Sequence, residues 1–137
     1  MAAALDEATA SAIYYDWPRW AGAAQLPPPG DWTTWLLMGG RGSGKTRAGA
    51  EWVRGLAAAG VSPIALVGET MTEAIDVMVR GESGLLRVTP RSERPVLRGH
   101  TLNWPNGATG TILPASDPER FRGPQFAAAW CDEIGKW

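Results

Sequence analysis

The residues of this chain that are best suited to chemistry lie in a glycine-rich run. This run matches the phosphate-binding pattern G-x-x-x-x-G-K-[ST]. Its glycines let backbone N–H groups approach a polyphosphate with no Cβ in the way, and the helix expected after the run offers its positive dipole end. The lysine ammonium is expected on the β and γ phosphate oxygens, and the threonine hydroxyl on Mg²⁺. The sequence therefore predicts a site for Mg²⁺ and ATP at Gly39, Gly40, Arg41, Gly42, Ser43, Gly44, Lys45 and Thr46.

An acidic pair supplies the second half of this chemistry. Asp132 and Glu133 directly follow the apolar run 126–131, which has the length of a strand. An acid at the C-terminal end of a buried strand in an open α/β sheet faces the crevice where ligands bind. We expect Asp132 to hold Mg²⁺ through its hydration shell and Glu133 to orient or deprotonate the attacking water. An Asp-Glu pair alone is as well explained by a solvated sheet edge, but together with the upstream cradle it is a candidate Walker B site.

Arginines and a glutamine are further candidates. Cleavage of the γ-phosphate spreads negative charge that such sites neutralise with an arginine in cis or from a neighbouring subunit. Arg41 lies inside the cradle. Arg122 lies on the loop before the carboxylate strand, from which it can reach a neighbouring subunit. A structural salt bridge is the alternative for each arginine. Gln25, just upstream of a proline run, is a candidate for contact with the adenine edge, with an ordinary exposed glutamine as the alternative.

The elements that must position these residues follow from the hydrophobic pattern. Residues 35–38 predict a short buried strand into the cradle and residues 46–59 a helix out of it, the order that the motif requires. Residues 64–68 predict a second buried strand. Thr70 is a plausible N-cap, with Glu73 at its N3 position, of a helix through residue 79. This alternation of strand and helix predicts an α/β fold with a parallel sheet.

The remaining segments are less regular. An irregular, arginine-bearing stretch covers 81–95, and a hairpin is expected where 100–104 and 109–113 flank an Asn-Gly pair. Residues 117–125 form a loop before the carboxylate strand. Residues 1–31 form a lead-in segment whose aromatic cluster we expect to pack against the sheet, with stacking on an adenine ring as the alternative. That cluster consists of Tyr14, Tyr15, Trp17 and Trp20.

Composition excludes several classes of function. The 137 residues suffice for one modest domain, and a net charge of −1 gives no global sign of nucleic-acid or membrane binding. The arginine excess over 80–98 faces either DNA phosphates or solvent. Cys131 is the only cysteine, so no disulfide can form within the chain, and we expect its small side chain to be buried. His100 is the only histidine, and we expect it in the hairpin or on the surface. With no membrane-spanning apolar run or basic leader, a soluble cytoplasmic protein is expected.

Three segments together resemble the large subunit of a phage-type terminase, and most closely the DNA-packaging proteins of alphaproteobacterial prophages and gene transfer agents. They are WLLMGGRGSGKTRAGAEW at 35–52, RFRGP at 120–124 and AWCDE at 129–133. The resemblance covers the chain from about residue 14 to its end. It implies a P-loop NTPase fold of the additional-strand class and an ATP-driven motor that docks at a procapsid portal and pumps double-stranded DNA inward.

The resemblance also implies roles and partners. Lys45, Thr46, Asp132 and Glu133 would carry the Walker roles, and arginines at positions matching Arg41 and Arg122 are proposed in the family to sense or stabilise the γ-phosphate, the latter across subunits. The expected partners are double-stranded DNA, a portal protein and a small terminase subunit. The expected assembly is a homo-oligomeric ring that works in the host cytoplasm.

One departure from the family concerns the end of the chain. Family members continue past the Asp-Glu pair into further strands, a coupling motif and a nuclease domain, whereas this chain ends four residues after Glu133. We therefore expect a lead-in segment at 1–31, a partial P-loop domain at 32–137 truncated after the Walker B strand, and no nuclease activity. Two alternatives stay open: a helicase- or recombinase-like ATPase fragment, and a non-catalytic remnant that offers only an interaction surface.

Overall fold

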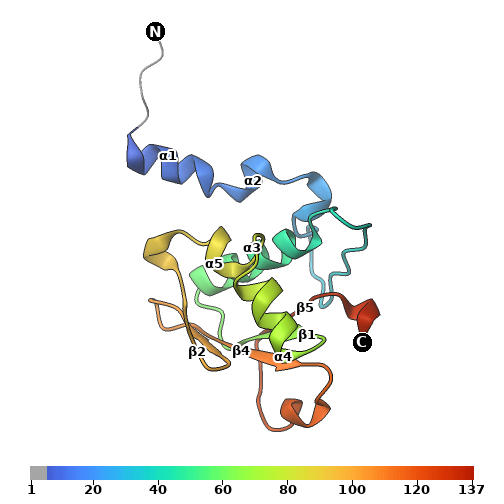
Figure 1. Cartoon of the computed structure of the whole chain (residues 1–137). Coiled ribbons are helices and arrows are strands. Elements are labelled where there is room, and N and C mark those ends of the chain that lie inside the picture. The colour runs from blue at the N-terminus through green and yellow to red at the C-terminus, as the bar shows by residue number, and fades with distance from the viewer. Residues whose placement is uncertain (1–5) are drawn as a thin grey trace.

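A mixed five-stranded sheet organises the chain (Figure 1), for which a computed structural model describes residues 6–137. The strand order is β2-β3-β4-β1-β5. Both neighbours of β1 are parallel to it, whereas β2, β3 and β4 form an antiparallel meander. The strands are β1 (Ile64–Gly68), β2 (Val96–Arg98), β3 (Thr101–Asn103), β4 (Thr109–Pro114) and β5 (Ala128–Cys131).

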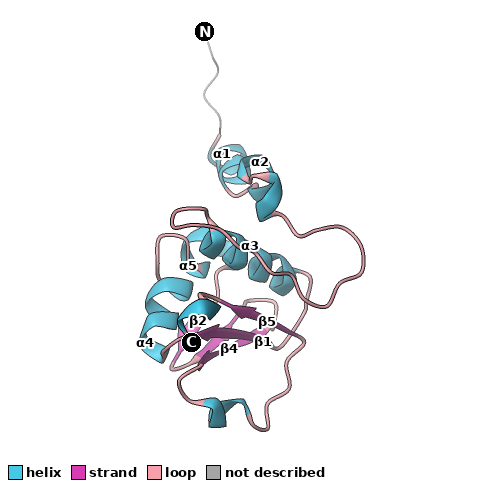
Figure 2. Ribbon diagram, turned by 90° about the vertical axis from the view of Figure 1, so that its right-hand side faces the viewer, coloured by secondary structure: helices cyan, strands magenta, loops and turns pink. Residues whose placement is uncertain are grey.

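Helices gather on one face of this sheet (Figure 2), and the lead-in helices lie beyond them. The helices are α1 (Glu7–Tyr14), α2 (Trp17–Trp20), α3 (Lys45–Ala58), α4 (Met71–Glu73), which continues as the π-helix η2 (Ala74–Val79), and α5 (Leu85–Val88). Short 3₁₀ turns are η1 (Ala23–Gln25), η3 (Arg91–Glu93), η4 (Pro118–Phe121) and η5 (Ile134–Lys136).

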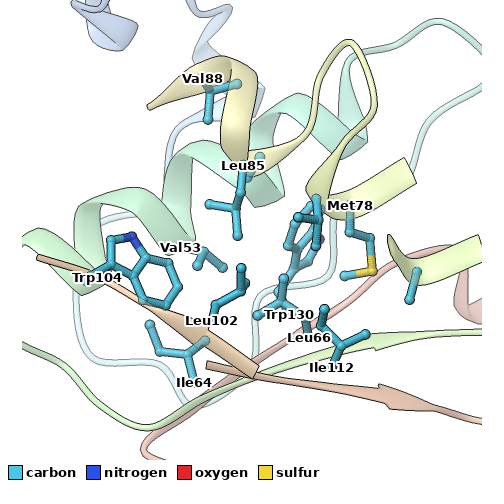
Figure 3. Packing of buried hydrophobic residues seen from close by; sticks show 14 of the residues in the cluster. Val53, Ile64, Leu66, Met78, Leu85, Val88, Leu102, Trp104, Ile112 and Trp130 are labelled. Carbon is cyan, nitrogen blue, oxygen red and sulfur yellow. The ribbon is translucent and has the colours of Figure 1, made fainter. Parts of the chain in front are cut away.

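The main core lies between that sheet face and the helices (Figure 3). Alternate residues of the strands, such as Leu66, Ile112 and Trp130, point toward Val53 of α3 and Met78 of η2. The opposite face of the sheet carries only a small cluster built on the other strand positions. Three helical elements, α3, η2 and α5, share this core with the sheet, and α3 is the helix that begins in the phosphate cradle.

Several predicted elements are confirmed. The helix after the cradle, the strand at 64–68 and the hairpin around Asn106-Gly107 are present, with Gly107 at φ 93° in the turn. Thr70 caps α4 as predicted, because its side chain accepts a hydrogen bond from the Glu73 amide. His100 is exposed beside the hairpin. The stretch 81–95 is more regular than predicted, since it contains α5 and η3.

Other predictions are wrong. The sheet is mixed, not parallel, because a hairpin adds antiparallel strands beside β4. Residues 35–38 belong to no strand, since within residues 6–137 no strand pairs with them; Leu36 is 67% exposed and Met38 78%. Trp35 instead packs near Trp32, with ring centroids 6.2 Å apart. Cys131 is exposed because the outer face of β5 is uncovered, while its neighbour Trp130 fills the core.

A close contact between α3 and β5 yields a stability prediction. A Cβ at Gly49 would overlap the indole ring of Trp130, which is 6% exposed and has no room to withdraw. We expect Gly49→Ala to lower the free energy of unfolding by about 2 kcal/mol or more, as overpacking does. Urea denaturation followed by circular dichroism measures it.

Gly55 provides the matched control on the same helix. Nothing lies within 4 Å of its Cβ position, so Gly55→Ala should stabilise the chain by about 0.5–1 kcal/mol through helix propensity alone. Equal effects of the two substitutions would contradict the proposed packing of α3 on β5.

Candidate functional site

The phosphate cradle is a turn that leads directly into α3. Gly44 is the N-cap of α3 in the left-handed conformation, with φ 82°, which side-chain-bearing residues rarely adopt. The Lys45 ammonium folds back over the loop and donates hydrogen bonds to the carbonyl oxygens of Gly39, at 2.6 Å, and Gly40, at 3.0 Å. The loop thus places this cation at the start of the helix, where the helix dipole also favours anions.

The predicted magnesium ligands converge at this point. The Thr46 hydroxyl lies 3.3 and 3.5 Å from the two carboxylate oxygens of Asp132, although 86 positions separate the residues. The Asp132 amide donates to the carbonyl of Val67 at 3.0 Å, which extends the pairing of β5 with β1 and fixes the carboxylate at the strand end. A hydroxyl beside a carboxylate is a set of hard oxygen ligands that fits Mg²⁺.

Burial governs the electrostatics of Asp132, which is 8% exposed. Loss of solvent raises the pKa of its carboxyl group, and the neighbouring Glu133 charge raises it further. The hydrogen bond from Thr46 and the charge of Lys45 act in the opposite direction. An additional cation at this carboxylate would therefore relieve an unfavourable buried charge.

A cavity of about 460 Å³ opens between the cradle and the carboxyl ends of the strands. Its volume is within the range of small-ligand sites. The cradle contributes one wall and the segment after β1 another, while the acidic pair lies between them. The lining residues are Gly39, Arg41, Lys45, Thr46, Gly68, Glu69, Glu73, Ala74, Val77, Met78, Asp132, Glu133 and Lys136.

Glu133 is the only residue with a side chain at positive φ within residues 6–137, at φ 50° and ψ 48°. Such a conformation is uncommon outside glycine and often occurs at functional sites. Glu133 begins the short turn η5 after β5 and lines the cavity together with Asp132.

The structure separates the two candidate arginines. Arg41 lines the cavity, as predicted for a residue of the cradle. Arg122 is not among the lining residues; its side chain is 80% exposed and pairs with Glu119 at 3.3 Å. The structure therefore brings Arg41, but not Arg122, to the site of its own chain.

Gln25 contacts the cradle from outside the cavity. Its side-chain amide donates to the carbonyl of Gly44 at 3.2 Å, and its side-chain oxygen accepts from the amide of Gly22 at 2.9 Å. One donor and one lone pair of the amide group remain after these two hydrogen bonds.

Two of the lead-in aromatics, Tyr15 and Trp17, lie on α3 and not on the sheet, whereas Tyr14 and Trp20 are 65% and 59% exposed, which corrects the prediction that the cluster packs against the sheet. The guanidinium carbon of Arg47 lies 4.9 Å from the centroid of the Trp17 ring, and that of Arg54 lies 5.7 Å from the centroid of the Tyr15 ring. Both arginines flank the buried Glu51 carboxylate, at 3.7 and 3.6 Å. Burial raises the pKa of Glu51, and the two guanidinium charges oppose that rise. The charged pairs thus tie the lead-in segment to the helix that carries the cradle.

Sequence reasoning missed the site residues Glu69, Glu73 and Lys136. Glu69 directly follows β1, so the rule that singled out Asp132 at a strand end also applied to Glu69. Lys136 pairs with both glutamates, at 3.5 Å with Glu69 and more closely with Glu73. No spacing in the sequence indicates this contact, because it depends on how the chain turns after Glu133.

Comparison with known proteins identifies the family. None of the helices in residues 6–137 has the length and apolar character that a membrane crossing requires. No curated protein and no solved structure matches the chain. The model of the family described as "Terminase large subunit, T4likevirus-type, N-terminal" matches residues 36–137, the segment that holds the cradle and the acidic pair. The chain therefore belongs to the DNA-packaging family of T4likevirus-type terminase large subunits, as part of their N-terminal region.

Proposed function

We propose that this chain binds and hydrolyses ATP, and that in the packaging motor this hydrolysis powers the movement of double-stranded DNA into a procapsid. One observation carries the proposal: the Thr46 hydroxyl and the Asp132 carboxylate meet beside the Lys45 cradle. A glycine-rich loop with a purely structural role does not account for a hydroxyl and a carboxylate that meet at a cavity.

Each residue at the cavity has a proposed role in the binding or hydrolysis of ATP. Backbone N–H groups of the cradle and the Lys45 ammonium bind the β and γ phosphates. Thr46 and Asp132 hold Mg²⁺, which when bound neutralises charge on the phosphate oxygens. Glu133 orients the attacking water and accepts its proton, and Arg41 stabilises charge on the γ-phosphate. The positions of Lys45, Thr46, Arg41, Asp132 and Glu133 on one cavity support these roles.

Gln25 supports the site in a second way. Its hydrogen bond to the Gly44 carbonyl holds the peptide at which the cradle enters α3. The remaining donor and lone pair of the amide suit the edge of an adenine ring. We therefore propose that Gln25 is a nucleotide-binding residue, which orients the cradle and contacts the adenine edge.

Arg122 is assigned to the site of a neighbouring subunit in a ring. Its 80% exposure suits a group that acts outside its own chain. In the assembled motor we expect Arg122→Ala to lower ATP turnover by about 10³-fold while ATP binding persists, as for an arginine finger. Arg120→Ala, on the same turn and paired with Asp117, is the matched control and should leave turnover unchanged.

Mixing two inactive variants distinguishes action across subunits from action within one chain. Rings that combine Arg122→Ala with Glu133→Gln subunits should recover part of the activity, because each supplies what the other lacks. No recovery in mixed rings would contradict the assignment of Arg122 to a neighbour's site.

Membership of the terminase family supports a proposal about the wider assembly. We propose that the partners are double-stranded DNA, the portal protein and the small terminase subunit, and that the motor works in the host cytoplasm. Residues 1–31 act as a lead-in segment to a P-loop domain at 32–137. We also propose the additional-strand class of this fold, which the parallel pairing of β1 with β4 and β5 supports.

Calorimetry of Mg·ATP binding tests the proposal directly, with circular dichroism to show that the sample is folded. Binding by the folded chain, followed by release of inorganic phosphate in the motor, is the expected result. A folded chain that binds no nucleotide would contradict the proposed function.

A further inference from the structure

The turn that carries Glu133 is tied to the rest of the molecule by a single lysine. Lys136 belongs to η5, and its ammonium pairs with the carboxylates of Glu69, at 3.5 Å, and Glu73. Within residues 6–137, these are the only side-chain hydrogen bonds or ion pairs of residues 133–137. Ile134 and Trp137 are 52% and 48% exposed, so hydrophobic burial holds this turn only weakly.

The two glutamates that pair with Lys136 are well anchored in the fold. Glu69 directly follows β1, which lies between β4 and β5 in the sheet. Glu73 lies in the first turn of α4, where its amide is held by the Thr70 hydroxyl. Both carboxylates line the same cavity as Glu133. Lys136 thus bridges from the acidic pair to the opposite wall of the nucleotide site.

Backbone geometry connects Lys136 to Glu133. The Lys136 amide donates to the Glu133 carbonyl at 2.9 Å, which closes one short turn. Glu133 itself has the left-handed conformation, which a residue with a side chain keeps only when its surroundings hold it there. A displacement of Lys136 would therefore be passed through this turn to the Glu133 backbone.

We infer that Lys136 is a positioning residue for ATP hydrolysis: its ion pairs with Glu69 and Glu73 hold the turn that aims Glu133 at the attacking water. This inference rests on the proposed function of the site. The pairs are partly exposed, so their contribution to stability is small. Their effect is on geometry, where a misplacement of about 1 Å costs about 10²-fold in rate.

The test compares Lys136→Ala with Lys136→Arg in the assembled motor. We expect Lys136→Ala to lower kcat by about 10- to 100-fold and to change the Kd for Mg·ATP by less than about twofold. Lys136→Arg, which can still pair with both glutamates, should restore most of kcat. Arg19→Ala removes a similarly exposed pair, with Asp16, far from the site along the chain and is the control.

Two results would overturn the inference. An unchanged kcat in Lys136→Ala would show that the pairs do not position Glu133. A parallel rise in Kd would instead show that Lys136 binds phosphate directly, since Lys136 also lines the cavity.

Amide hydrogen exchange in the folded chain separates this inference from the proposed function. Exchange at the backbone amide of position 136, which donates to the Glu133 carbonyl, should be faster in Lys136→Ala than in the wild type and unchanged in Arg19→Ala. A wild type that shows no turnover would contradict the proposed function. Unaltered exchange in Lys136→Ala would contradict the positioning role of Lys136, whether or not the wild type shows turnover.

Discussion

Lys45→Ala is expected to weaken the binding of Mg·ATP by about 100-fold. Each charge-assisted hydrogen bond from the ammonium to a phosphate oxygen contributes about 1.5–3 kcal/mol, and each 1.4 kcal/mol corresponds to about tenfold in Kd. Among the described residues, this ammonium donates hydrogen bonds only to the carbonyls of Gly39 and Gly40, and Lys45 lines the cavity where a phosphate would bind.

Calorimetry measures this Kd, and Gly55→Ala on the same helix serves as the control for a change in α3 that leaves the cradle intact. The fold should survive Lys45→Ala because this side chain is not part of the hydrophobic core. If Lys45→Ala bound Mg·ATP as tightly as the wild type, the cradle would not be the phosphate site.

Glu133→Gln should have the opposite signature, with binding retained and turnover lost. Removal of a general base costs about 10²- to 10⁴-fold in rate, whereas an amide of the same shape leaves the cavity open to nucleotide. Single-turnover release of inorganic phosphate, with Kd measured in parallel, is the appropriate experiment.

Asp132→Asn separates the two acids of the pair. Because Asp132 faces the Thr46 hydroxyl, its substitution should weaken the Mg²⁺-dependent part of ATP affinity, which Glu133→Gln leaves unchanged. The assigned roles would be wrong if Glu133→Gln and Lys45→Ala reduced binding equally.

The parts of the site that the sequence predicts are those encoded by local patterns. The glycine run predicts a loop with a helix directly after it, and the helix is present from Lys45, with Gly44 as its N-cap. Asp132 was predictable from the strand-end rule, since any parallel sheet brings the carboxyl ends of its strands to one edge. The approach of Asp132 to Thr46 further requires that α3 pack on the sheet with its first turn at the edge where β5 ends.

The features that the sequence does not predict depend on pairing partners. Residues 35–38 have the composition of a buried strand, yet a strand needs a neighbour with free backbone groups, which hydropathy does not identify. Cys131 was expected inside because its run is apolar, but an edge strand with one covered face buries only alternate residues. The contact of Lys136 with Glu73 likewise depends on the backbone turn at Glu133.

The contact of Gly49 with the Trp130 indole has a consequence for motion. Gly49 lies on the helix that begins at the cradle, and Trp130 lies two positions before Asp132 on β5. A helix and strand in such close contact move as one body, since separating them would expose part of the core. The distance between Thr46 and Asp132 should therefore be the same in every nucleotide state, and slow fluctuations during turnover should be confined to the opposite wall of the cavity.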